Sequence, residues 1–99
     1  MNITVVRNEK ELTVILEGRL DTLTSPELEE KLDELLHDVE KLVFDFEMLE
    51  YISSAGLRVL ACAMDAMEEL GGELVVKNVC PDVQDVFEVT GFIEELTIE

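Results

Sequence analysis

The sequence predicts an α/β fold: one domain with a mostly parallel, mixed β-sheet, an N-terminal hairpin and helices packed against the sheet. Its 99 residues match the length of a single domain with one core. Apolar residues recur alternately at the spacing of strands and at the spacing of helices. Strands that alternate with helices pair in parallel through right-handed crossovers. The predicted order is ββαβαβα with a short final segment, within one domain that spans residues 1–99.

The beginning of the chain predicts a β-hairpin. Val5-Val6 and Leu12–Leu16 have the composition of strands, and the polar segment 7–11 between them predicts the turn. Gly18 is expected to end the second strand. Residues 19–24 then form a loop that leads to the first helix.

The first helix is predicted from the residues at its start. Pro26 suits the first turn, because a proline lacks the N–H group that would be unpaired there. Thr24 with Glu27 fits a capping box, in which side chains bond the free N–H groups of the first turn. Apolar residues follow at helical spacing as far as Val39.

The second half of the chain predicts two strands and two helices. Lys41–Phe46 carries consecutive apolar residues, which favours a strand covered on both faces. The later elements are a helix over 57–70 that Gly71-Gly72 ends, a strand over 73–77, a helix from Pro81 to Gly91, and a short strand or packed tail over 95–98. Nine residues are expected to form one core: Val14, Leu32, Leu36, Val43, Phe44, Leu60, Met64, Val75 and Phe87.

The composition excludes some classes of partner. A formal charge of −17, with only 7 Lys and Arg, argues against nucleic acid and against an anionic membrane surface, but it suits a protein partner with a basic patch. The sequence has no apolar run of membrane-spanning length and no signal peptide, so we expect a cytoplasmic protein. Cys62 and Cys80 lie among apolar neighbours and are expected to be reduced, packed thiols.

No residue pattern predicts catalysis, so we expect no enzyme activity, no cofactor and no metal site. A nucleophilic serine needs a base, and the only histidine, His37, falls at the far end of the first predicted helix. One histidine without a second imidazole or a thiol at ligand spacing does not predict zinc. No glycine-rich loop matches a phosphate-binding or dinucleotide-binding motif.

The segment Tyr51–Arg58, YISSAGLR, places two hydroxyls where the second helix begins. This point follows the central strand, at the edge where ligands and partners usually meet such sheets. The free N–H groups and positive dipole end of a helix start tolerate a phosphate. The residues alone favour a simpler role, in which a serine caps the helix and Gly56 allows close packing. A serine that accepts phosphate stays the alternative.

Four short motifs follow one another along nearly the whole chain. They are Gly18-x-Leu20-Asp21-x-x-Thr24, Leu49-x-Tyr51-Ile52-Ser53-Ser54-Ala55-Gly56-Leu57, Gly71-Gly72-Glu73-Leu74 and Thr90-Gly91-Phe92. Together they resemble the STAS domain, and more narrowly the stand-alone anti-sigma factor antagonists of bacteria.

The resemblance implies a regulatory protein. In this family the unphosphorylated domain binds an anti-sigma factor that is also an ATP-dependent serine kinase, and the sigma factor is released. The kinase phosphorylates a serine at the start of the second helix, the antagonist dissociates, and a metal-dependent serine phosphatase restores it. We expect a monomer or a weak dimer.

The family's usual motif at the acceptor is Asp-Ser-Ser/Thr-Gly. Counting back from Gly56 makes Ser54 the acceptor and puts Ser53 where the Asp stands, so Ser53 is an alternative acceptor. The partner-binding residues that the resemblance implies are Asp21, Thr22, Thr24, Ser53, Ser54, Ala55, Gly56 and Arg58. A phosphate there is expected near Asp21 and a turn with Glu47 and Glu50, where it would repel a partner. The alternative function is a STAS scaffold subunit of a transport or signalling complex that is not phosphorylated.

Overall fold

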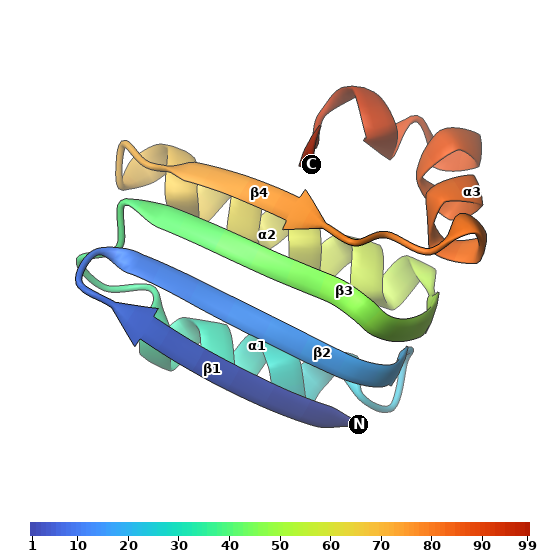
Figure 1. Ribbon diagram of the computed structural model, residues 1–99, viewed down its shortest axis with the longest axis horizontal. Helices are drawn as coiled ribbons and strands as arrows, with labels where there is room; N and C mark the ends of the chain where they lie inside the picture. The colour runs from blue at the N-terminus through green and yellow to red at the C-terminus, as the bar shows by residue number, and fades with distance from the viewer.

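The computed structural model describes all residues from 1 to 99 (Figure 1). Its elements, in chain order, are β1 (Asn2–Asn8), β2 (Glu11–Leu20), α1 (Ser25–Leu35), β3 (Lys41–Ile52), α2 (Ser54–Glu69), β4 (Glu73–Lys77), α3 (Pro81–Thr90), the 3₁₀ helix η1 (Phe92–Glu94) and β5 (Thr97–Ile98). The predicted order is confirmed, and the final segment contains a short strand.

The five strands form one mixed sheet in the order β1-β2-β3-β4-β5. β1 and β2 pair antiparallel as a hairpin, and every other neighbouring pair is parallel. The predicted fold class is therefore confirmed. Because β2, β3 and β4 run in the same direction, the segments that follow them emerge at one edge of the sheet.

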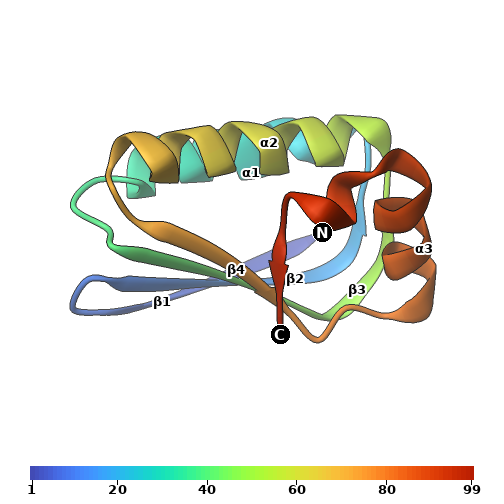
Figure 2. The same ribbon diagram turned by 90° about the horizontal axis from the view of Figure 1, so that it is seen from above.

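The helices do not sandwich the sheet. Figure 2 shows α1 and α2 side by side on one face, with α3 beyond one end of the strands and no helix on the opposite face. The prediction that Lys41–Phe46 is covered on both faces was therefore wrong. Its apolar residue on the open face, Val43, is buried by its cross-strand neighbours Thr13 and Val75 instead of by a helix.

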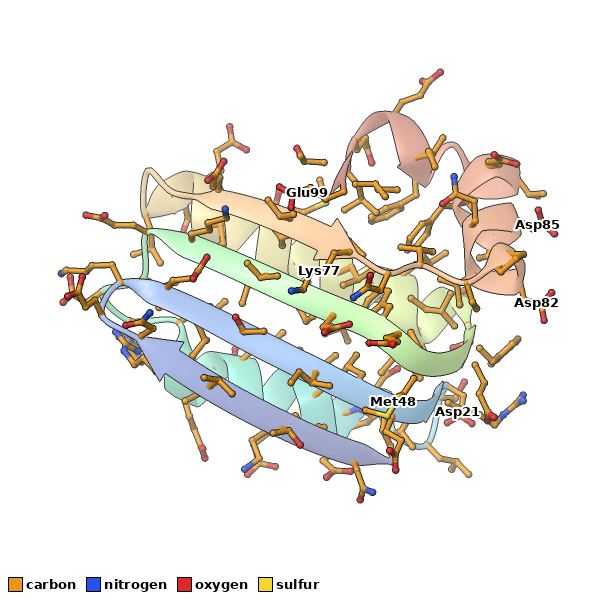
Figure 3. All side chains as sticks on the ribbon, viewed as in Figure 1. Asp21, Met48, Lys77, Asp82, Asp85 and Glu99 are labelled. Atoms are coloured by element: carbon orange, nitrogen blue, oxygen red, sulfur yellow. The ribbon has the colours of Figure 1, made fainter.

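The core lies between the sheet and the helices. Five of the predicted core residues belong to its cluster of 22 buried residues: Val14, Leu32, Phe44, Leu60 and Phe87. Leu36 and Met64 are partly buried against that cluster. Val43 and Val75 are buried on the open face and lie outside it, so the prediction of one core for all nine was too simple. The open face also carries Lys77, which Figure 3 shows on the side of the sheet away from α1 and α2.

Two strands run further than their sequence indicates. β2 continues through Gly18, whose φ of 110° suits glycine, and the pairing register shifts between Gly18 and Arg19. The glycine therefore marks a bulge and not the end of the strand. β3 continues to Ile52, so Glu47 and Glu50 lie on a strand where a turn was expected.

The first helix is shorter than predicted. It ends at Leu35, and Asp38 takes a left-handed φ of 56° that redirects the chain before Val39 is buried. The Arg7 guanidinium donates to the carbonyl oxygens of His37 and Asp38 at 3.1 Å each. These bonds stabilise the connection outside the helix.

Both cysteines are free thiols. Cys80 is half-buried, with its Sγ 3.4 Å from the carbonyl oxygen of Leu49. Cys62 is exposed on α2, so the prediction of a packed thiol was wrong there. None of the helices has the length and apolar character needed to cross a membrane.

Candidate functional site

The site forms where the ends of two parallel strands meet the starts of two helices. Leu20, the last residue of β2, pairs in register with Ile52, the last residue of β3. The Ser53 N–H donates to the carbonyl oxygen of Leu20 at 2.9 Å. Residue 21 therefore begins its loop beside the two serines that start α2.

The two serines have different structural roles. Ser53 is the N-cap of α2: its backbone is extended, and its Oγ accepts a hydrogen bond from the Gly56 N–H at 3.4 Å. Its carbonyl oxygen also accepts the first helical bond, from the Leu57 N–H at 2.9 Å. Ser54 is the first helical residue, and its side chain is exposed. The hydroxyl of Ser53 thus serves the helix, while that of Ser54 faces solvent.

Gly56 fixes the start of α2 against the sheet. A Cβ atom added at this position would lie 2.8 Å from Ile52 Cγ1 and 2.9 Å from Leu20 Cγ. Both of these side chains are buried, so they have little room to move. Gly56 is itself buried, and its close contact with the sheet fixes the position of the two serines that precede it. Ala55, between Ser54 and Gly56, is half-buried.

Asp21 organises the loop between β2 and α1. Its Oδ1 accepts from the Leu23 N–H at 3.0 Å and from the Thr24 N–H at 3.1 Å. Thr24 Oγ1 accepts from the Asp21 N–H at 2.9 Å and donates to the Arg19 carbonyl oxygen at 2.8 Å. Its side chain makes no bond to the helix start, so the predicted Thr24–Glu27 capping box was wrong.

The same hydrogen bonds keep Asp21 ionised. The Thr24 N–H is the largest cause that lowers the pKa of the Asp21 carboxyl below its ordinary value of 3.8. Burial opposes this shift, and the Leu23 N–H, the Thr24 hydroxyl and the charge of Arg19 reinforce it. Asp21 is thus a fixed negative charge and also the residue that shapes its loop.

Leu23 belongs to the site although no sequence motif indicated it. Its side chain is 89% exposed, although the hydrogen bond from its N–H to Asp21 holds its backbone in the turn. An apolar residue inside a loop where polar residues predominate is the feature that could have indicated it. Leu23 adds an apolar contact point to the loop that Asp21 organises.

Two cavities lie near the site, and they have no residue in common. One, of about 220 Å³, lies between the starts of α1 and α2 and is lined in part by Thr22, Pro26, Ala55 and Arg58. Thr22 and Arg58, both expected at the partner surface, are thereby brought together.

The other cavity, of about 660 Å³, is lined by Glu17, Glu47, Glu50 and Asp82 among others. Glu47 and Glu50 were expected to form a turn beside the serines, and that expectation was wrong. They line a separate acidic cavity to which β2, β3 and the start of α3 contribute residues. Figure 3 shows Asp21 at the same end of the molecule as Asp82. No group of three or more His, Cys, Asp or Glu side chains is placed to hold a metal ion.

Comparison with known proteins shows the family. The family model of the STAS domain matches residues 2–99. The chain belongs to the STAS domain family. This STAS domain is 34% identical over 94 residues to BtrV of Bordetella bronchiseptica, a protein proposed to be an anti-sigma factor antagonist; the match covers 94% of this chain and 81% of BtrV. It is 30% identical to the anti-sigma-B factor antagonist of Staphylococcus aureus strain NCTC 8325, with 92% of this chain and 85% of that protein covered.

Solved structures share its fold. The unphosphorylated anti-sigma factor antagonist SpoIIAA superposes with a TM-score of 0.80 at 18% identity, over 99% of this chain and 87% of that one. The phosphorylated form of SpoIIAA, a Bacillus cell fate determinant, gives 0.78 at 19% identity, over 99% and 91%. The fold and the family predicted from the sequence are therefore confirmed.

Proposed function

We propose that this STAS domain is an anti-sigma factor antagonist that phosphorylation of Ser54 switches off. The observation that carries the proposal is the division of roles between the two serines. Ser53 Oγ is engaged as the cap of α2, whereas Ser54 Oγ is exposed at the first helical position. A kinase therefore reaches Ser54 without unwinding the helix, and phosphorylation of Ser53 would cost the cap.

The reaction takes place on a partner enzyme, and this chain is its substrate. The Ser54 oxygen forms a bond to the γ-phosphorus of ATP while the bond from that phosphorus to the β,γ-bridging oxygen breaks. ADP leaves with the bonding electrons, and the hydroxyl proton passes to a base on the kinase. The fixed carboxylate of Asp21 and the helix dipole are the charges that this chain supplies near the acceptor.

The partner in the unphosphorylated state is an anti-sigma factor with kinase activity. Its docking surface consists of Ser54, Arg58 and the loop from Asp21 to Thr24, from which Leu23 projects. The overall charge of −17 suits a partner with Lys or Arg in its interface, and association then slows as salt is added. A phosphate brings roughly −1.5 to −2 charge to this surface and opposes the contact.

A mapping experiment tests the proposal. The protein is incubated with the serine-kinase anti-sigma factor of its own organism and ATP, and its tryptic peptides are mapped by mass spectrometry. Phosphate is expected on Ser54 in the wild type and in Ser53→Ala, and Ser53 is expected to stay unmodified in Ser54→Ala. Phosphate on Ser53 in the wild type would transfer the acceptor role to that residue. An unmodified protein would contradict the switch and favour the scaffold subunit.

A further inference from the structure

Arg58 lies one helical turn after Ser54 on α2. Residues four apart share a face of a helix, and the Cα–Cβ bond of a helical residue tilts toward the helix N-terminus, so Ser54 lies within reach of the Arg58 side chain. Both residues are exposed. The guanidinium can thus reach a group attached to the Ser54 oxygen without any change in the backbone.

The Arg58 guanidinium has no ionic partner within the protein. The ion pairs in the structure join Lys10 to Asp38 and Lys41 to Glu11 and Glu73. Glu29 of α1 lines the same cavity as Arg58, yet the two form no ion pair. Arg58 is therefore an unpaired cation near an exposed serine, in a chain whose net charge is −17.

The other arginine at this end of the molecule is already engaged. The Arg19 guanidinium lies over the Tyr51 ring, 4.3 Å from its centroid. Of these two arginines, Arg58 is therefore the one that is free to bind a phosphate on Ser54.

We propose that Arg58 is the internal counter-ion of phosphorylated Ser54. The inference rests on the proposed function, because it applies once Ser54 carries phosphate. The planar guanidinium then donates two hydrogen bonds to phosphate oxygens, and the N-terminus of α2 adds its dipole. Before phosphorylation the same guanidinium is free to meet an acidic group on the partner.

If Arg58 binds the phosphate on Ser54, one modification changes the docking surface in two ways. Phosphorylation adds negative charge to the docking surface, and it also withdraws the Arg58 cation from the partner. Neither effect requires α2 to move, since both residues lie on its first two turns. Glu29 and Asp21 are the nearby carboxylates that oppose the added phosphate from α1 and from its preceding loop.

A titration tests the pair without any kinase. Phosphoserine is incorporated at position 54 during translation, and the second pKa of the phosphate, ordinarily about 6, is followed by ³¹P NMR between pH 4.5 and 8. We expect this pKa to be about half a unit lower with Arg58 than in Arg58→Gln, and the difference to shrink in high salt. Arg58→Lys should restore part of the shift, because a lysine keeps the charge but loses the paired donors.

Lys31→Gln is the matched control. It removes one exposed cation from the neighbouring helix α1 and should leave the phosphate pKa within about a tenth of a unit of the parent value. Equal pKa values with and without Arg58, in variants whose amide spectra show the native fold, would overturn the pair. Absence of kinase phosphorylation at Ser54 would count against the proposed function alone, since this titration uses installed phosphoserine.

Discussion

Gly56→Ala tests how the fold positions the serines. The new Cβ would lie 2.8 Å from Ile52 Cγ1 and 2.9 Å from Leu20 Cγ, distances at which atoms must move. Such overpacking costs about 1–3 kcal/mol, in the upper part of that range here because both contacted side chains are buried, and the better helix propensity of alanine returns about 1 kcal/mol. We expect a net loss of about 1–2 kcal/mol in the free energy of unfolding.

Urea unfolding measures this loss through the midpoint, with the slope unchanged if the unfolded state is unaffected. A double-mutant cycle with Leu20→Ala identifies its cause. Leu20→Ala removes the contact to Leu20 Cγ and leaves the one to Ile52 Cγ1, so Gly56→Ala should cost less stability in that background than in the wild type. A Gly56→Ala protein as stable as the wild type would refute the idea that this glycine packs the start of α2 onto the sheet.

Three further predictions concern the residues of the site. Ser53→Ala should lower the free energy of unfolding by about 0.5–1 kcal/mol because it removes a long capping bond, whereas Ser54→Ala should change it by less than about 0.5 kcal/mol; both are measured in urea. Asp21→Asn should have a lower free energy of unfolding than the wild type above about pH 4. This difference should vanish as the pH falls through the lowered pKa of Asp21, because the carboxyl stabilises the folded state only while it is ionised. Leu23→Ala should weaken binding to the anti-sigma factor at least about threefold with no loss of thermal stability, while Val89→Ala, which alters a residue of similar exposure on α3, should leave binding unchanged; equal affinities would remove Leu23 from the interface.

The sequence specified the order of elements because strand and helix periods are properties of short segments. It did not specify which face each helix covers. The apolar run around Val43 resembled a strand that helices cover on both faces. Val43 is instead buried by its cross-strand neighbours, Thr13 on β2 and Val75 on β4, and no helix covers it. The sequence of one strand does not contain that information, because the burial depends on the register of its neighbours.

Local motifs in the site were ambiguous for a similar reason. Thr24 and Glu27 have capping-box spacing, but Asp21 and Arg19 lie close enough to bond Thr24 first. Gly18 resembles a strand terminator and is a bulge within β2. The family motif located both serines, but only the three-dimensional structure showed that Ser53 holds the cap while Ser54 is exposed.

The affinity of the anti-sigma factor for two forms of this protein distinguishes a phosphorylation switch at Ser54 from a scaffold. Isothermal titration compares the unmodified chain with the chain that carries phosphoserine at position 54. We predict that the phosphorylated form binds at least about a hundredfold more weakly, since the added charge of roughly −1.5 to −2 opposes the contact and engages Arg58. Equal dissociation constants for the two forms would show that phosphorylation of Ser54 does not switch the antagonist off.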